Sequence, residues 1–311
     1  MGVKDLYKLI AASAPGAISE VDVAELDGWT VAVDASLSIY QLHSMGEKHK
    51  IVNTVGAPIN AILGTFYRVA KMITSGITPA YVFDGAPPAA KSHELAQRKS
   101  MRTARAFTGV PRGVFAEIAR LVMMMGATSI QAPGEAESQA ALLTRNDSLD
   151  AVLTEDMDVI PLGATTMVRG WSVSASTVTL IETDLVLKGL GLTRGQFVDL
   201  CIMLGTDYTI TTLAGIGPKR ALAAIREHGS LEKILATVKD PPSATNFDYI
   251  EARVQFMRPN VTPTKFKIAL RKLGLRDIVA IREFMVTTHK IAPSMIEATL
   301  HKLAAYYAIK Y

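Results

Sequence analysis

The sequence contains a single cysteine and no long apolar run, although hydrophobic residues make up 49% of its 311 positions. The thiol of Cys201 cannot form a disulfide within the chain, and its apolar neighbours from Leu200 to Leu204 indicate core packing in a reducing compartment. A membrane-spanning helix needs about 18 consecutive apolar residues, and no segment reaches that length. The first residues also lack the apolar region of a signal peptide, so we expect a soluble, intracellular protein that does not bind membranes.

Several catalytic arrangements are missing as well. The six histidines include no His-x-x-x-His pair that a helix would present to one metal ion. The sequence has no phosphate-binding loop of the Walker A type, and no serine, histidine and aspartate whose positions mark them as a catalytic triad. It also has no internal repeats or low-complexity tracts. These absences argue against histidine-based metal sites, P-loop chemistry and triad hydrolysis.

The net charge of +4 is distributed unevenly along the chain. Residues 91–120 carry seven lysines or arginines against two acids, and residues 261–311 carry nine against three. The rest of the chain must therefore be net acidic. Two basic regions and an acidic remainder suit a protein that binds a polyanion and holds a carboxylate metal site, although ordinary solvated surface charge explains the layout equally well.

Short apolar runs alternate with amphipathic segments of helix length through the first two hundred residues. This pattern is typical of an α/β fold with a mostly parallel central sheet flanked by helices. Strands are predicted at residues 30–33, 79–83, 127–131, 151–154 and 177–181, and helices at 57–75, 114–125, 135–144 and 194–204. From Thr211 onward the pattern is helical, which predicts a second, helical lobe packed on the sheet.

Acidic residues recur where predicted strands or helices end. Ligands of an open parallel sheet bind outside the carboxyl ends of its strands, so these side chains are expected to converge. One aspartate after one strand is usually a turn former or a helix cap, but four strands that end this way are harder to explain by structure alone. The seven residues are Asp34, Asp84, Glu135, Glu137, Asp156, Asp158 and Asp207.

Clustered carboxylates repel one another unless cations neutralise them, and hard oxygen ligands select Mg²⁺, or Mn²⁺ as a substitute, over zinc. Asp156 and Asp158 share a face if their segment is extended. Glu135 and Glu137 would diverge on a regular helix, so either they lie in an irregular first turn or one acts through water. Two ions about 4 Å apart would activate water and stabilise both the attacking and the leaving oxygen of a phosphodiester displacement.

Two further features carry positive charge. Lys91 and Arg98 are seven residues apart, so they share one face of a helix that would rise from Asp84. They could hold the scissile phosphate and stabilise its developing charge, although a solvated basic helix has the same spacing.

A glycine-containing break separates two predicted helices after residue 213. Gly215 and Gly217 would let backbone N–H groups approach a phosphate at a helix N-terminus, and Lys219 and Arg220 add charge there. Such a module contacts the DNA backbone and does not read bases.

In their order along the chain, these motifs resemble the flap endonucleases of the structure-specific 5′ nuclease, or XPG-like, superfamily. The resemblance runs from Met1 to about Val261. It rests on Met1-Gly2-Val3-Lys4-Asp5-Leu6, Tyr81-Val82-Phe83-Asp84-Gly85, Ala132-Pro133-Gly134-Glu135-Ala136-Glu137, Thr154-Glu155-Asp156-Met157-Asp158, Leu204-Gly205-Thr206-Asp207-Tyr208 and Gly215-Ile216-Gly217-Pro218-Lys219-Arg220-Ala221.

The resemblance implies a PIN-like nuclease core built from an N-terminal nuclease region, residues 1–105, and an internal nuclease region, residues 114–210. A helix-two-turn-helix DNA-binding lobe would span residues 211–261 and a divergent helical segment residues 262–311. The seven acids would be metal ligands, Lys91 and Arg98 the catalytic cations, and Tyr40 a base-stacking residue. Gly2 would lie near the active site, and the hairpin at Gly215 would bind duplex DNA with K⁺.

The implied function is a divalent-metal-dependent 5′ flap endonuclease with 5′-3′ exonuclease activity, which acts on branched or nicked double-stranded DNA in replication or repair. Two alternatives stay open. One is an exonuclease, or a junction or bubble endonuclease, of the same superfamily. The other is a catalytically silent DNA-binding scaffold. We expect a monomer that acts in the nucleus or at another site of DNA replication, including a viral one.

Three departures from the family pattern accompany the resemblance. Arg98 and Gly126 are 28 positions apart, fewer than the helical arch and cap of cellular flap endonucleases require. This shortening predicts a reduced arch and leaves the threading of free 5′ ends open. Ala86 replaces the lysine that usually follows Asp-Gly. The last fifty residues contain no sliding-clamp-binding box, so recruitment by that route is not expected.

Overall fold

A mostly parallel seven-stranded sheet forms the centre of the computed structural model, which describes residues 2–49, 51–93, 96, 110–213, 215–238, 242–243 and 246–309. Its strand order is β1-β7-β6-β5-β2-β3-β4. The strands from β6 to β4 in this order run parallel, and β7 is antiparallel to both of its neighbours. The strands are β1 (Ile18–Asp22), β2 (Thr30–Asp34), β3 (Thr78–Phe83), β4 (Thr128–Gln131), β5 (Ala151–Leu153), β6 (Thr166–Arg169) and β7 (Thr177–Glu182).

Both faces of the sheet are buried, which explains the continuous apolar runs of its central strands. Successive side chains of a strand point to opposite faces. Val31 and Val33 of β2 therefore join one hydrophobic core, while Ala32 joins the other.

Helices cover each face. One core includes side chains of α3 (Asn60–Thr74) and α5 (Arg112–Met124), and α2 (Ala35–His49) packs against α3. The other includes α1 (Leu6–Ser13), α6 (Ala136–Arg145), α7 (Thr183–Leu190) and α8 (Arg194–Leu204). Short 3-10 turns connect these elements: η1 (Pro15–Ala17), η2 (Val23–Leu26), η3 (Ala89–Lys91) and η4 (Met157–Val159). None of the helices in the described part of the chain is long and apolar enough to cross a membrane.

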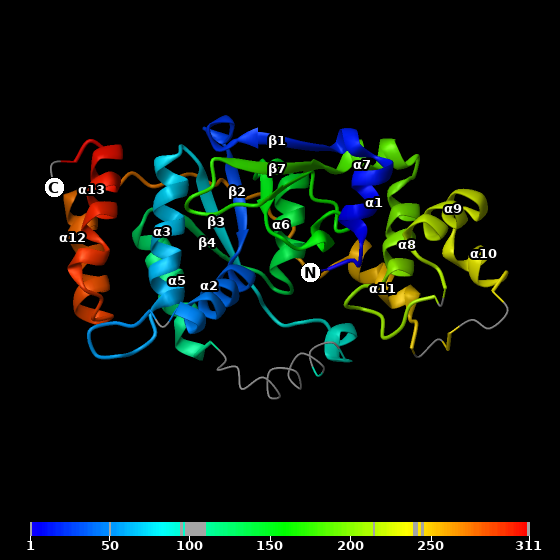
Figure 1. Ribbon diagram of the computed structural model, residues 1–311, viewed down its shortest axis with the longest axis horizontal. Helices are drawn as coiled ribbons and strands as arrows, with labels where there is room; N and C mark the ends of the chain where they lie inside the picture. Colours follow the sequence, from blue (N-terminus) through cyan, green and yellow to red (C-terminus); the bar gives the residue numbers. More distant parts are fainter. Residues whose placement is uncertain are drawn as a thin grey trace.

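A helical lobe and a C-terminal helical pair lie at opposite ends of the α/β core (Figure 1). The lobe consists of α9 (Pro218–His228), α10 (Leu231–Leu235) and α11 (Tyr249–Met257), which pack on α8. At the other end, α12 (Leu275–Glu283) packs on α5 and α13 (Glu297–Tyr306) packs on α3, with η5 (Phe284–Thr288) and η6 (Pro293–Met295) between them.

The chain crosses the core between these two ends. Thr262 exchanges hydrogen bonds with the Gln139 side chain, and the N–H of Arg271 donates to the carbonyl of Gly126. The last fifty residues therefore brace the α/β core and do not extend the helical lobe.

The predicted fold class is confirmed: the sheet is mostly parallel and has flanking helices. Strands β1 and β6 were not among the predicted strands. β1 lies at the edge of the sheet and none of its residues is buried, so the sequence Ile18-Ser19-Glu20-Val21-Asp22 lacks an apolar run. β6 has only two buried residues, Met167 and Val168.

Candidate active site

The predicted acids gather at the carboxyl edge of the sheet. Asp34 is the last residue of β2 and Asp84 follows β3. These strands are neighbours, and β4 and β5 flank them. The remaining acids follow the flanking strands or α8: Glu135 and Glu137 after β4, Asp156 and Asp158 after β5, and Asp207 after α8.

Asp34 and Asp84 are oriented by backbone amides. Oδ1 of Asp34 accepts the N–H of Leu37 at 2.9 Å, and Oδ1 of Asp84 accepts the N–H of Ala136 at 2.8 Å. The second bond ties the end of β3 to the first turn of α6. Burial, and then the charge of Asp84, raise the pKa of Asp34 to about 7. Asp34 therefore lies in a crowded anionic environment.

Asp156 and Asp158 are almost completely buried. The N–H of Asp158 donates to Oδ1 of Asp156 at 3.2 Å, and the N–H of Val3 donates to Oδ1 of Asp158 at 2.8 Å. The other oxygen of Asp158, Oδ2, is buried and has no hydrogen-bond partner. Burial, and then the charge of Asp156, raise the pKa of Asp158 well above its ordinary value. An unsatisfied buried carboxylate oxygen calls for a cation.

Gly2 lies against these two carboxylates. Its φ is +78°, and a Cβ atom there would lie 2.0 Å from Oδ1 of Asp156 and 2.5 Å from Oδ1 of Asp158. Only glycine fits this conformation and this distance.

Glu135 and Glu137 lie at the start of α6, which corresponds to the first of the two options that the sequence left open, an irregular first turn. Glu135 is the N-cap and has an extended backbone, with φ −77° and ψ 139°, while Glu137 lies in the first helical turn. Burial, and then the charge of Asp156, raise the pKa of Glu137 well above its ordinary value. The change of backbone conformation at Glu135 lets the two side chains share the site.

Lys91 ends η3 and is buried among the acids. Its Nζ atom lies 2.5 Å from Oε1 of Glu135 and 3.6 Å from Oδ2 of Asp207. Burial alone would lower the pKa of Lys91, but nearby carboxylates, led by Glu137, raise it above its ordinary value. Lys91 is therefore a fixed positive charge at this site. Its predicted partner, Arg98, lies outside the described residues, as does most of the predicted basic helix and shortened arch.

The described residues include no group of three or more histidine, cysteine, aspartate or glutamate side chains already arranged around a single metal position. The donor set nevertheless suits hard divalent cations, because its members are carboxylates and include the unsatisfied Oδ2 of Asp158, and burial raises the pKa values of Asp34, Glu137, Asp156 and Asp158. Net negative charge therefore accumulates at this edge of the sheet.

The predicted glycine hairpin lies in the helical lobe, immediately before α9. Gly215 has a φ of +73°, Gly217 is the N-cap of α9, and a Cβ atom at either would meet nothing within 4 Å. Lys219 and Arg220 are exposed, and Arg220 also donates to the carbonyl of Gly215 at 3.1 Å. The hairpin is thus an open helix N-terminus with two cations.

Tyr40 lies on α2, close to the carboxyl end of β2. Its ring meets Phe115 of α5 edge to face, with centroids 5.8 Å apart, and its side chain is partly exposed. This aromatic pair joins two helices on the same face of the sheet.

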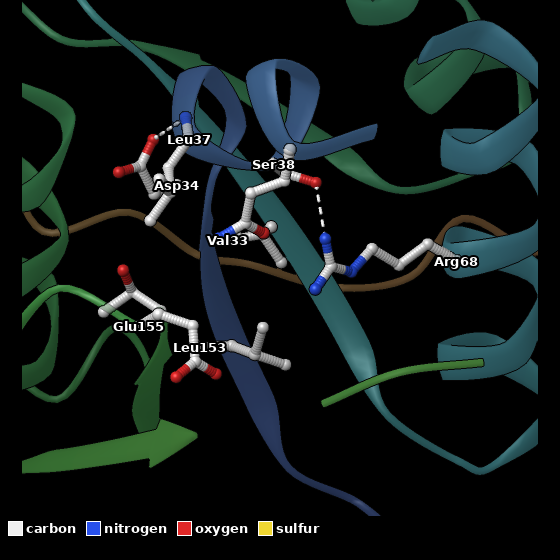
Figure 2. A pocket seen from close by; sticks show the side chains of 9 residues that line it. Val33, Asp34, Leu37, Ser38, Arg68, Leu153 and Glu155 are labelled. Carbon is white, nitrogen blue, oxygen red and sulfur yellow. Dashed lines mark hydrogen bonds between the residues drawn. The ribbon is translucent and has the colours of Figure 1, made fainter. Parts of the chain in front are cut away.

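A pocket beside Asp34 brings in residues that the sequence did not single out. Figure 2 shows Arg68 of α3 directed toward Ser38, whose Oγ accepts a hydrogen bond from the guanidinium at 2.8 Å. Glu155 lines the same pocket. The available signal for Arg68 was that it is one of two cations, with Lys71, in a mostly apolar helix. Tyr208, which contacts Lys91, ends the motif Leu204-Gly205-Thr206-Asp207-Tyr208, and no spacing rule distinguishes it there.

Comparisons with known proteins agree with this arrangement. The XPG N-terminal domain matches residues 1–105, and the XPG I-region matches residues 126–207. The catalytic core of Rad2 in complex with DNA substrate aligns at 26% identity with a TM-score of 0.78, covering 94% of this chain and 98% of that one. Flap endonuclease-1 from Methanococcus jannaschii aligns at 25% identity with a TM-score of 0.75, covering 94% and 96%. The fold and the site thus define an XPG-type nuclease.

One relative identifies the family within this class of nucleases. Flap endonuclease 1 of Sordaria macrospora is 35% identical over 334 residues, which cover 97% of this chain and 84% of the relative. The chain belongs to the XPG-like flap endonuclease family. It is a structure-specific nuclease that hydrolyses DNA phosphodiester bonds at 5′ flaps, and dependence on divalent metals is general in this family.

Proposed function

We propose that 5′ flap cleavage occurs at the carboxyl edge of the sheet with Mg²⁺ as the metal. The observation that carries this proposal is the burial of Asp34, Asp156 and Asp158 beside further carboxylates, which raises their pKa values. Two ions would balance such a cluster, and Mn²⁺ has the ligand preference to substitute. The proposed ligands are Asp34, Asp84, Glu135, Glu137, Asp156, Asp158 and Asp207.

The hydrogen bonds around the acids leave oxygens for these ions. Oδ1 of Asp158 accepts the N–H of Val3, so Oδ2 remains for a metal. Bound divalent ions supply the Lewis acidity that activates water and stabilises charge on the phosphate oxygens. The expected products carry a 5′ phosphate and a 3′ hydroxyl, and accompanying 5′-3′ exonuclease activity would use the same site.

Lys91 supplies the fixed positive charge for the phosphate. An ammonium group preorganised in a buried site stabilises charge that develops in the transition state without reorganising. In the metal-bound enzyme, Lys91 would turn from Glu135 and Asp207 to the scissile phosphate, which would leave Oε1 of Glu135 and the Asp207 carboxylate for the ions. The proposal gives Arg98 the same role, on the strength of its seven-residue spacing from Lys91.

DNA contacts outside the metal site involve the hairpin and Tyr40. The uncrowded Gly215 and Gly217 leave room for a phosphate or a K⁺ ion at the start of α9, with Lys219 and Arg220 beside it. Tyr40 would stack on a base near the cleavage point, and Gly2 would lie close to the same end of the DNA. Neither contact reads sequence, which suits an enzyme selective for branched structure.

A double-flap substrate with a 5′ label tests the proposal directly. With Mg²⁺, the wild-type enzyme is expected to release a labelled flap product of defined length. Asp156→Ala should reduce the single-turnover rate by at least about a hundredfold, because a buried metal ligand is lost. Asp184→Ala, an exposed acid on α7, is the matched control and should cleave normally. Undiminished cleavage by Asp156→Ala would contradict the assignment of the metal site.

The choice among related activities is tested with the same label. We expect a free 5′ flap to be cut faster than a nicked duplex, and a flap blocked at its 5′ end to show whether free ends are required. Preferential cutting of a four-way junction or a bubble would favour the alternative activities of the superfamily. DNA binding without metal-dependent turnover would identify a silent scaffold.

The cellular setting follows from the reaction. Flap removal belongs to DNA replication and repair, and we propose that the enzyme works as a monomer in the nucleus or at another site of DNA replication. Size-exclusion chromatography with light scattering would reveal any stable oligomer.

A further inference from the structure

Tyr208 contacts both members of the ion pair between Lys91 and Glu135. Nζ of Lys91 lies 5.0 Å from the centroid of the Tyr208 ring. The Tyr208 hydroxyl donates to Oε2 of Glu135 at 2.5 Å, while Lys91 occupies the other oxygen, Oε1, also at 2.5 Å. The tyrosine therefore offers its aromatic ring to the ammonium of Lys91 and its hydroxyl, as a hydrogen-bond donor, to the carboxylate of Glu135.

The Tyr208 ring is itself held in place. Its side chain is buried, with only 5% of the residue exposed, and its ring meets Phe256 of α11 at 5.1 Å with an interplanar angle of 83°. The backbone N–H of Tyr208 also donates to Oγ1 of Thr206 at 3.3 Å. A ring fixed on two sides is a rigid support for the flexible lysine chain.

The charges around Lys91 make such a support necessary. Asp207 lies 3.6 Å away, and Glu137 also attracts the ammonium. Lys91 is paired with Glu135 in this structure, and without the ring its flexible chain could carry the ammonium to other carboxylates of the cluster. An aromatic face attracts a desolvated cation without competing as a metal ligand.

We propose that Tyr208 is a positioning residue: its ring limits where the Lys91 ammonium can lie within the acidic cluster, and its hydroxyl fixes the orientation of Glu135. The inference rests on the proposed function of the same site. It concerns how the ammonium is held, and it predicts coupling between Tyr208 and Lys91 that packing alone would not produce.

Two substitutions separate the parts of this role. Tyr208→Phe keeps the aromatic face and loses the hydrogen bond to Glu135, so kcat should fall about threefold with little change in KM. Tyr208→Leu loses both contacts, and kcat should fall about thirtyfold. For each variant, kcat and KM are measured in multiple-turnover cleavage of a 5′-labelled double flap with saturating Mg²⁺, and the thermal midpoint is recorded in parallel.

A double-substitution cycle supplies the decisive readout. In a Lys91→Met background, Tyr208→Leu should cause only the roughly threefold loss that belongs to the Glu135 hydrogen bond, because the cation that its ring positions is gone. Phe247→Leu is the packing control, since Phe247 is fully buried in the same hydrophobic core. It should lower the thermal midpoint by an amount similar to Tyr208→Leu while kcat stays within about twofold.

The possible outcomes separate the two proposals. If Tyr208→Leu lowers the rate equally with and without Lys91, or if Phe247→Leu lowers kcat as much, Tyr208 acts through packing and the inference is overturned. If Lys91→Met and Asp156→Ala both cleave normally, the proposed active site itself fails. If those two variants lose activity but the effects of Tyr208→Leu and Lys91→Met on the rate are independent of each other, only the positioning role is refuted.

Discussion

The backbone N–H of Val3 donates to Oδ1 of Asp158 across 2.8 Å, although the two residues are 155 positions apart in the sequence. The preceding residue, Gly2, lies directly against Asp156 and Asp158. The first residues of the chain therefore help to orient the acids that follow β5. Changes near the N-terminus are expected to alter chemistry as well as folding.

Substitution of Gly2 by alanine should damage the site. A Cβ atom would lie 2.0 Å from Oδ1 of Asp156, and a φ of +78° costs an L-residue about 1–2 kcal/mol. The segment must shift, which would displace the Val3 hydrogen bond to Asp158. We expect flap cleavage to slow by about tenfold or more, measured as single-turnover rate at saturating Mg²⁺.

Gly16→Ala is the matched control for this change. A Cβ atom at Gly16 meets nothing within 4 Å, so cleavage and stability should stay near wild type. Equal rates for the Gly2 and Gly16 variants would show that the N-terminal segment does not shape the site.

Asp158→Asn should make the metal-free protein more stable and should make its stability less responsive to Mg²⁺. Burial beside Asp156 makes ionised Asp158 unfavourable in the absence of a cation, so the neutral amide should raise the thermal midpoint of the metal-free protein. The same change should remove most of the stabilisation that Mg²⁺ gives the wild type, which would be about 2.7 kcal/mol at a hundredfold excess over Kd.

Differential scanning fluorimetry with chelator or Mg²⁺ measures both effects. Ca²⁺ serves as a comparison ion, because it prefers the same oxygen ligands. A variant that is destabilised without metal and stabilised by Mg²⁺ as strongly as the wild type would contradict the role of Asp158.

The sequence predicted which acids come together at this site better than it predicted how they are arranged. Asp34, Asp84 and Asp156 follow apolar runs, and parallel strands end at one edge, so their convergence follows from periodicity and topology. The divergence expected for Glu135 and Glu137 on a regular helix is avoided because Glu135 is the N-cap with an extended backbone. From the sequence, this placement in an irregular first turn was one of two options, and the other was that one of the two acids acts through water.

Other features depend on contacts between distant parts of the chain, which no local pattern contains. The role of Tyr208 depends on Lys91, more than a hundred positions away, and on Phe256 beneath it. The passage of residues 262–273 along the core depends on hydrogen bonds to Gln139 and Gly126. Edge strand β1 was missed because its residues are partly solvated, which removes the apolar signal.

The helical lobe offers a test of a buried ion pair. Asp199 of α8 is 4% exposed and accepts hydrogen bonds from the Arg253 guanidinium of α11 at 2.8 Å and from the N–H of Leu231 at 3.1 Å. Arg253→Met would leave the Asp199 charge without its cation. We expect the free energy of unfolding to fall by about 3 kcal/mol, measured by urea denaturation.

The second partner of Arg253 provides the control. Glu232 lies 2.7 Å from the guanidinium but is exposed, so Glu232→Gln should cost less than about 1 kcal/mol. Similar losses in the two variants would mean that the buried aspartate does not anchor the lobe.

His289 should make the C-terminal attachment sensitive to acid. Burial lowers the pKa of His289 below its ordinary value of 6.5, opposed by Glu117, which lies 3.4 Å away on α5, while Arg120 of the same helix lowers the pKa further. Its ring packs on Phe284, and its carbonyl accepts a hydrogen bond from Asn53. His289 thus joins α5 and η5 through its imidazole and the loop before α3 through its carbonyl.

The sign of the pH effect follows from this lowered pKa. Above pH 6.5 the imidazole is largely neutral in the folded and unfolded states, and its contribution to stability is fully present. As the pH falls, the unfolded chain takes up the proton first, so stability is lost down to the folded pKa. Urea denaturation between about pH 7.5 and 5.5 should show this loss in the wild type and a flatter profile in His289→Gln. His228→Gln, at the end of α9, should keep the wild-type slope, and a His289→Gln profile as steep as the wild type would assign the acid sensitivity to other groups.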